Sequence, residues 1–82
     1  MAGNKEISTL TGKVFLNKRT ELGISQEKMA EYLKISHRQY YNLEHGIKCC
    51  SLETFSNFVD SCNVDATKIL SDIAAISKMN KE

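Results

Sequence analysis

Two short runs of helical periodicity, each preceded by a serine, most limit what this chain can fold into. A serine before a helix accepts hydrogen bonds from the free amides of the first turn, and Ser25 and Ser36 both stand in that place. Apolar residues then recur at helical spacing, at Met29, Ala30 and Leu33 after the first serine and at Tyr40, Leu43 and Ile47 after the second. The stretch 25–46 therefore predicts two short helices joined by a turn at residues 34–36.

The outward side of the second helix carries side chains that suit DNA. Opposite its apolar positions lie His37, Arg38, Tyr41, Asn42 and His45. The bases of the segment 34–48 are Lys34, Arg38 and Lys48, and its one acid, Glu44, falls at the inner edge of the helix. The DNA major groove is wide enough for one helix and presents base edges that Arg and Asn can pair with in bidentate fashion. We therefore expect this helix to bind double-stranded DNA.

Residues on both sides of the stretch 25–46, together with residues within it, match the pattern of a known protein family. The series comprises Arg19, the run 22–27, Met29, Ala30, Leu33, Ile35, Ser36, the run 43–46, the run 51–54, Asn63 and Val64. Over about residues 13–70 the chain resembles the Cro/C1-type, or XRE, family of helix-turn-helix DNA-binding domains. The resemblance implies an all-α fold, a compact five-helix bundle of the phage-repressor (lambda repressor-like) type, with the helix-turn-helix at 25–46.

Three positions depart from the family pattern. Lys34 stands where the family usually has glycine, Tyr40 replaces a small aliphatic residue, and Cys50 stands where the family often has proline. Because Lys34 has a Cβ, a left-handed conformation there should cost on the order of 1 kcal/mol. We expect these departures to change local geometry and to leave the fold intact.

The resemblance also implies roles for individual residues. The residue matching Gln26 binds a DNA phosphate at the start of the first short helix, where backbone amides also point. The residues matching His37, Arg38 and Asn42 reach into the groove. By chemistry the arginine suits guanine O6 and N7, the asparagine suits adenine N6 and N7, and the histidine suits a base or a phosphate. The residues expected to flank the sugar-phosphate backbone are Tyr41, His45 and Lys48.

Three further helices are predicted around the central pair. The first runs from Thr9 or Thr11 to Leu22, with Leu10, Val14, Phe15 and Leu22 facing inward, and ends at Gly23. The second follows Ser51 and ends at Asn63, and its apolar stripe is Leu52, Phe55, Phe58, Val59 and Cys62. Across the bundle, Arg19 and Glu44 match a family pair that forms a partly buried salt bridge.

The last predicted helix follows Asp65 and carries more apolar residues than the core should need. Its apolar stripe continues at Ile73 and Ile76. An apolar surplus on a terminal helix is typical of an interface, so we expect these two isoleucines to form the contact of a homodimer; the alternative is a longer helix that packs back on the first helix.

Length and composition fit a single small domain. From the 82 residues we expect one domain at 1–82, with an ordered core at about 9–77 and without an appended domain. The apolar content of 41% and the charged content of 26% are ordinary for a soluble globule, and no run approaches the roughly 18 apolar residues that span a membrane. Residues 1–10 lack the apolar core of a secretory signal, which predicts a cytoplasmic protein.

Three other functions have less support in the sequence. A thiol- or metal-responsive site would use Cys49 and Cys50 with His45, but adjacent cysteines close a disulfide poorly and three ligands fall short of a closed zinc site. An enzyme is not supported, since the chain has no Gly-rich phosphate loop, paired carboxylates in an apolar setting or activated nucleophile. A protein-binding module on the same fold is the strongest alternative, but the polar side chains at 26, 37, 38 and 42 favour DNA.

The sequence therefore predicts a small sequence-specific transcriptional regulator without a cofactor or a metal, acting as a homodimer on a palindromic operator. A phage or mobile-element repressor and a controller protein of a restriction system both fit this prediction. The formal net charge of +1 is small for a protein that binds DNA without sequence preference.

Overall fold

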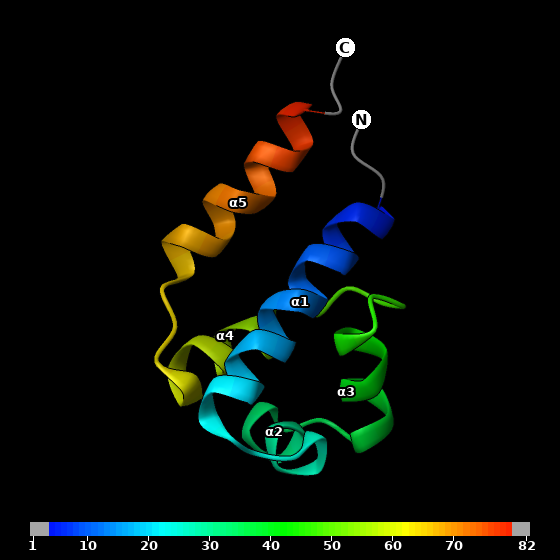
Figure 1. Ribbon diagram of the computed structural model, residues 1–82, viewed down its shortest axis with the longest axis vertical. Helices are drawn as coiled ribbons and strands as arrows, with labels where there is room; N and C mark the ends of the chain where they lie inside the picture. The colour runs from blue at the N-terminus through cyan, green and yellow to red at the C-terminus, as the bar shows by residue number, and fades with distance from the viewer. Residues whose placement is uncertain (1–3, 80–82) are drawn as a thin grey trace.

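Five helices make up the part of the chain that the structure, a computed structural model, describes: residues 4–79, with the side chains of residues 5–75 (Figure 1). The helices are α1 (Asn4–Leu22), α2 (Gln26–Leu33), α3 (His37–Glu44), α4 (Leu52–Cys62) and α5 (Ala66–Met79). No strand occurs within residues 4–79, and none of these helices is long and apolar enough to cross a bilayer. The predicted all-α, five-helix architecture is confirmed.

The helices begin where the sequence places capping side chains. The hydroxyl oxygens of Ser25, Ser36 and Ser51 each accept a hydrogen bond of 3.1 Å from the backbone amide three residues on. Before α5, Asp65 Oδ1 accepts from Lys68 N at 3.2 Å. At Ser36 the bond is returned, because Gln39 Oε1 accepts from Ser36 N at 2.9 Å and completes a capping box. The start of α3 is therefore fixed by two reciprocal hydrogen bonds.

Left-handed residues end three of the helices. Gly23 (φ 69°), Lys34 (φ 61°) and Asn63 (φ 54°) follow α1, α2 and α4 respectively. Lys34 thus takes the conformation that the family usually gives to glycine, and its amide donates to Glu31 O at 3.1 Å. The turn keeps its shape in spite of the strain at a residue with a Cβ.

The core lies where α1, α3 and α4 meet, and it is organised by one aromatic side chain. Phe15 of α1 packs edge-on against Phe58 of α4, with ring centroids 4.6 Å apart, and against Tyr40 of α3 at 6.1 Å. The buried apolar residues are Phe15, Met29, Ala30, Leu33, Tyr40, Leu43, Phe58, Cys62 and Ile69. Each helix contributes at least one of them, so the α2–α3 pair is held by the rest of the bundle.

The N-terminal helix begins earlier than predicted. It starts at Asn4, so Thr9 and Thr11 lie inside it and cap nothing. Thr11 Oγ1 instead donates to Ile7 O at 3.0 Å and to Ser8 O at 3.1 Å. A threonine within a helix can satisfy its hydroxyl through a preceding carbonyl in this way, so a capping preference alone misplaces the helix start. At the other end, α5 continues to Met79, and residues 80–82 lie outside the described residues.

Three apolar residues that the periodicity turns inward face solvent instead. Leu22, Ile47 and Leu52 are 42%, 61% and 83% exposed. Leu22 is the last residue of α1, Leu52 is the first of α4, and Ile47 follows the end of α3. At a helix end the chain changes direction, so the 3.6-residue period no longer fixes which way a side chain points.

Helices α1 and α3 approach each other at a glycine that the sequence analysis did not single out. A Cβ at Gly12 would lie 2.7 Å from the carbonyl oxygens of both Leu43 and Glu44. Helix α1 can therefore pass over the C-terminal end of α3 only because position 12 has no side chain. Beside α1, α5 packs along the same helix, and the two extend together beyond the other three (Figure 1).

Candidate nucleic-acid interface

The exposed side of α3 carries the residues that the sequence assigns to base contacts. His37 and Arg38 form its first turn directly after the Ser36 cap, and both are exposed. Asn42, one turn further on, is half-buried. On the opposite side of the helix Tyr40 and Leu43 are buried in the core. The same amphipathic pattern that anchors α3 thus presents its polar side to solvent.

Two cations on this side are available to a ligand. Within the described residues the ion pairs are Lys18–Glu21, Arg19–Glu44, Lys28–Glu31 and Lys68–Asp72, and none of them includes Arg38 or Lys48. Both of these side chains are exposed, one at the start of α3 and one in the loop that follows it. A phosphate or a guanine can therefore approach them without competing with a carboxylate of the protein.

The loop after α3 folds back over Asn42. The amides of Ile47 and Lys48 donate to Asn42 O at 2.9 and 3.3 Å. The Asn42 side chain lines a shallow hollow together with Gln39, Lys48, Cys49 and Cys50. Asn42 therefore lies nearer to this loop than Arg38 does, at the edge of the exposed side of α3.

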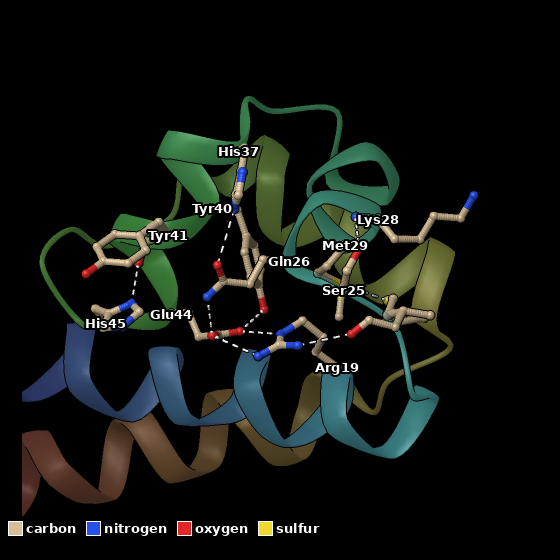
Figure 2. Close-up of polar contacts among 12 residues, drawn as sticks. Arg19, Ser25, Gln26, Lys28, Met29, His37, Tyr40, Tyr41, Glu44 and His45 are labelled. Carbon is tan, nitrogen blue, oxygen red and sulfur yellow. Dashed lines mark hydrogen bonds and ion pairs between the residues drawn. The ribbon is translucent and has the colours of Figure 1, made fainter.

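Tyr41 and His45 form a stacked pair along the flank of α3. Their ring centroids are 3.9 Å apart with an interplanar angle of 21°, and His45 Nδ1 lies 2.9 Å from Tyr41 O (Figure 2). A carbonyl oxygen only accepts hydrogen bonds, so Nδ1 of His45 carries the proton and donates. The two residues predicted to flank the DNA backbone thus contact each other, which the sequence analysis missed although their four-residue spacing permits it.

Behind α3 the structure joins Arg19 and Glu44 in a bidentate ion pair. Arg19 Nε donates to Glu44 Oε2 at 2.7 Å and Arg19 Nη2 donates to Oε1 at 3.2 Å, while Nη1 donates to Ile24 O at 3.0 Å (Figure 2). The Glu44 side chain is only 5% exposed. The pair ties α1 to the C-terminal end of α3 and to the segment that leads into α2.

Two more donors complete the surroundings of the Glu44 carboxylate. Tyr40 Oη donates to Oε2 at 2.6 Å and Gln26 Nε2 donates to Oε1 at 2.8 Å. Burial raises the pKa of Glu44. The hydrogen bonds from Arg19, Tyr40 and Gln26 lower it by more than burial raises it, so the net pKa lies below its ordinary value. Burial and the same carboxylate raise the pKa of Tyr40, which stays a phenol and a donor. The departure of Tyr40 from the family pattern thus adds a donor to this charge pair.

Gln26, the predicted phosphate ligand, is part of this network. Besides its bond to Glu44, its Oε1 lies 3.2 Å from His37 Nε2 (Figure 2). The side chain therefore connects the buried ion pair to the first residue of α3, across the turn between the two helices. Sequence reasoning placed Gln26 and His37 at the DNA surface separately and did not predict that they touch.

The two adjacent cysteines lie in the loop before α4. Cys49 is exposed and Cys50 is half-buried, and burial together with the neighbouring Cys49 raises the pKa of Cys50 to about 11. A raised pKa keeps the thiol protonated, whereas nucleophilic and metal-binding cysteines need the thiolate. Among the residues that the structure describes, no group of three His, Cys, Asp or Glu side chains is arranged to hold a metal ion.

Comparison with known families agrees with this geometry. A family model of helix-turn-helix domains matches residues 16–69, which include all of α2, α3 and α4. No curated protein sequence matches the chain. Since the family model covers more than half of the chain, the chain belongs to the Cro/C1-type (XRE) helix-turn-helix family of DNA-binding transcriptional regulators.

Proposed function

We propose that this regulator binds a specific operator as a homodimer, with α3 lying in the major groove of each half-site. The observation that carries the proposal is the exposed first turn of α3, where Arg38 has no acidic partner within the described residues, on a helix whose C-terminal end is tied to α1 by the Arg19–Glu44 pair. A preorganised helix with an unpaired arginine at its outer end suits direct readout of bases.

The chemistry of the exposed side also favours DNA over a protein partner. Its charged side chain is Arg38, and its other members are histidine, glutamine, tyrosine and asparagine. The core of a protein–protein interface is usually apolar or aromatic, whereas phosphates and base edges call for such cationic and polar groups. We assign Arg38 to guanine, Asn42 and His37 to neighbouring bases, and Tyr41, His45 and Lys48 to the backbone.

Arg38→Ala should lower affinity for the operator by about 5- to 150-fold, because a bidentate contact to guanine contributes roughly 1–3 kcal/mol of discrimination. It should also abolish the base preference at one symmetric pair of positions. Binding-site selection from a random DNA pool, followed by titration on the selected duplex and on unrelated DNA, measures both effects. A palindromic consensus in that selection would establish the two-fold operator.

Lys48→Ala is the matched comparison, since Lys48 is also exposed and follows the end of α3. A phosphate contact positions the protein and carries no sequence information, so this variant should weaken binding to all sequences alike. It should also reduce the slope of log affinity against log salt concentration by about one. If Arg38→Ala behaved in this uniform way instead, α3 would not lie in the groove as proposed.

The homodimer is proposed to form through α5. Ile73 is half-buried against the core of its own subunit, the side chain of Ile76 lies outside the described residues, and Leu70 is 55% exposed beside an apolar hollow lined by Leu52, Phe55 and Ile73. Part of Ile73 and 55% of Leu70 thus remain to be covered, and a small domain gains stability from such burial.

Sedimentation at micromolar concentration should show a dimer for the wild type and a folded monomer for Ile76→Asp and for Leu70→Asp, because a carboxylate in an apolar contact costs more than the contact contributes. Leu22→Asp is the control, since Leu22 is also partly exposed but lies at the C-terminal end of α1 and does not line this hollow. A wild type that sediments as a monomer at high concentration would remove this part of the proposal.

A further inference from the structure

We infer that His37 reads DNA as a hydrogen-bond acceptor through Nδ1, and so selects the exocyclic amino group of a cytosine or an adenine. The inference rests on the proposed function for its DNA partner, but its first step concerns the free protein alone. That step follows from the hydrogen bond between Arg19 and Glu44 and from two further hydrogen bonds, which lead from Glu44 to Gln26 and from Gln26 to His37.

The carboxylate fixes the orientation of the Gln26 amide. Arg19 holds Glu44 ionised, and an ionised carboxylate only accepts hydrogen bonds. The Gln26 atom 2.8 Å from Glu44 Oε1 must therefore be the amide nitrogen, because a carbonyl oxygen in that place would face a negative charge with no hydrogen between them. The amide oxygen of Gln26 consequently points the other way, toward α3 (Figure 2).

The orientation of Gln26 fixes the tautomer of His37. Gln26 Oε1 lies 3.2 Å from His37 Nε2, and an amide oxygen only accepts, so Nε2 carries the hydrogen. A neutral imidazole has one N–H, and therefore Nδ1 of His37 keeps a lone pair. The side chain is exposed, and Nδ1 forms no hydrogen bond with any of the described residues. His37 thus presents one fixed acceptor to solvent at the start of α3.

An acceptor at this place discriminates among bases. In the major groove the donors are the amino groups N4 of cytosine and N6 of adenine, whereas guanine presents the two acceptors N7 and O6. Next to His37, Arg38 has only donors to offer and suits guanine. The first turn of α3 therefore presents a hydrogen-bond acceptor, at His37, next to hydrogen-bond donors, at Arg38. Gln26 is the positioning residue, because it determines which nitrogen of His37 is the acceptor.

Nitrogen-15 NMR of the free protein above neutral pH tests the tautomer without DNA. The ring nitrogens of the two histidines should show opposite patterns of chemical shift in one spectrum. His37 should carry its hydrogen on Nε2, which donates to Gln26, and His45 should carry its hydrogen on Nδ1, which donates to Tyr41 O. Gln26→Met, which keeps the length of the side chain and removes both hydrogen bonds, should move the His37 pattern toward the average of two exchanging tautomers and leave His45 unchanged. Hydrogen on Nδ1 of His37 in the wild type would overturn the inference.

A cycle with modified operators tests the reading itself. The base pair read by His37 is the one at which His37→Ala loses its preference in binding-site selection. Replacing the adenine or cytosine there by the analogue without the exocyclic amino group should weaken wild-type binding roughly five- to tenfold more than it weakens binding of His37→Ala, the size expected for one hydrogen bond. Because the analogue disturbs base pairing equally for both proteins, the difference isolates the contact.

The outcomes separate this inference from the proposed function. Equal losses for the two proteins, with Arg38→Ala still relaxing specificity, would overturn the role of His37 and leave the regulator bound through α3. Absence of any preferred sequence for the wild type would overturn the proposed function and with it the reading of a base, whereas the NMR result on the free protein would still stand.

Discussion

Glu44→Ala should lower the free energy of unfolding by about 3 kcal/mol, because removing one partner of a buried ion pair leaves the other charge uncompensated. The carboxylate accepts four hydrogen bonds and is 5% exposed, so its removal strands the Arg19 guanidinium in a partly buried place and leaves the buried Tyr40 hydroxyl without its acceptor. Chemical denaturation with the linear extrapolation measures the loss. Glu31→Ala is the control, because its pair with Lys28 spans 3.8 Å between two exposed side chains and should change stability by less than about 0.5 kcal/mol.

A mutant cycle and a pH series sharpen this prediction. Arg19→Met should cost far less in a Glu44→Leu background than in the wild type, because the charge it would strand is already gone. The pKa of Glu44 is lower in the folded protein than its ordinary value of 4.5, so the stability that it contributes is complete above that value and is lost as the pH falls through the lower, folded pKa. Glu44→Gln should lack this loss. Additive effects of the two substitutions would show that Arg19 and Glu44 act independently.

Gly12→Ala should destabilise the protein by roughly 2–3 kcal/mol, although alanine is about 1 kcal/mol better than glycine in a helix interior. The added methyl would lie 2.7 Å from two backbone carbonyl oxygens of α3, at Leu43 and Glu44, and backbone atoms in the middle of a packed bundle cannot move aside cheaply. Relief of the clash would push α3 away from α1. A smaller affinity for the operator should therefore accompany the loss of stability.

Gly23→Ala distinguishes a steric cost from a backbone cost. Gly23 has a φ of +69°, and a Cβ there meets no atom within 4 Å. Its replacement should therefore cost on the order of 1 kcal/mol, from the left-handed conformation alone. Thermal or chemical unfolding of the two variants side by side measures the difference. Should Gly12→Ala equal or exceed the wild type in stability, the two helices would not approach as closely as the structure has them.

What the sequence determined by itself is the local structure of the helix-turn-helix. The caps at Ser25 and Ser36, the left-handed residue at Lys34 and the apolar positions between them all depend on atoms a few residues apart. Periodicity likewise placed Phe58 and Cys62 in the core and left Arg38 exposed. Such features can be predicted because the hydrogen bonds and steric limits that decide them lie within one or two turns of the chain.

Only the tertiary structure decided which side chains meet across helices. The approach of α1 to α3 at Gly12, and the convergence of Tyr40 and Gln26 on Glu44, depend on helix crossing and on side-chain directions that no local pattern encodes. The same holds for the contact between Gln26 and His37, which gives two predicted DNA ligands a joint role inside the protein. Capping preference identifies a possible helix start, but α1 begins at Asn4 because packing and hydrogen bonding over the whole helix outweigh one favourable cap.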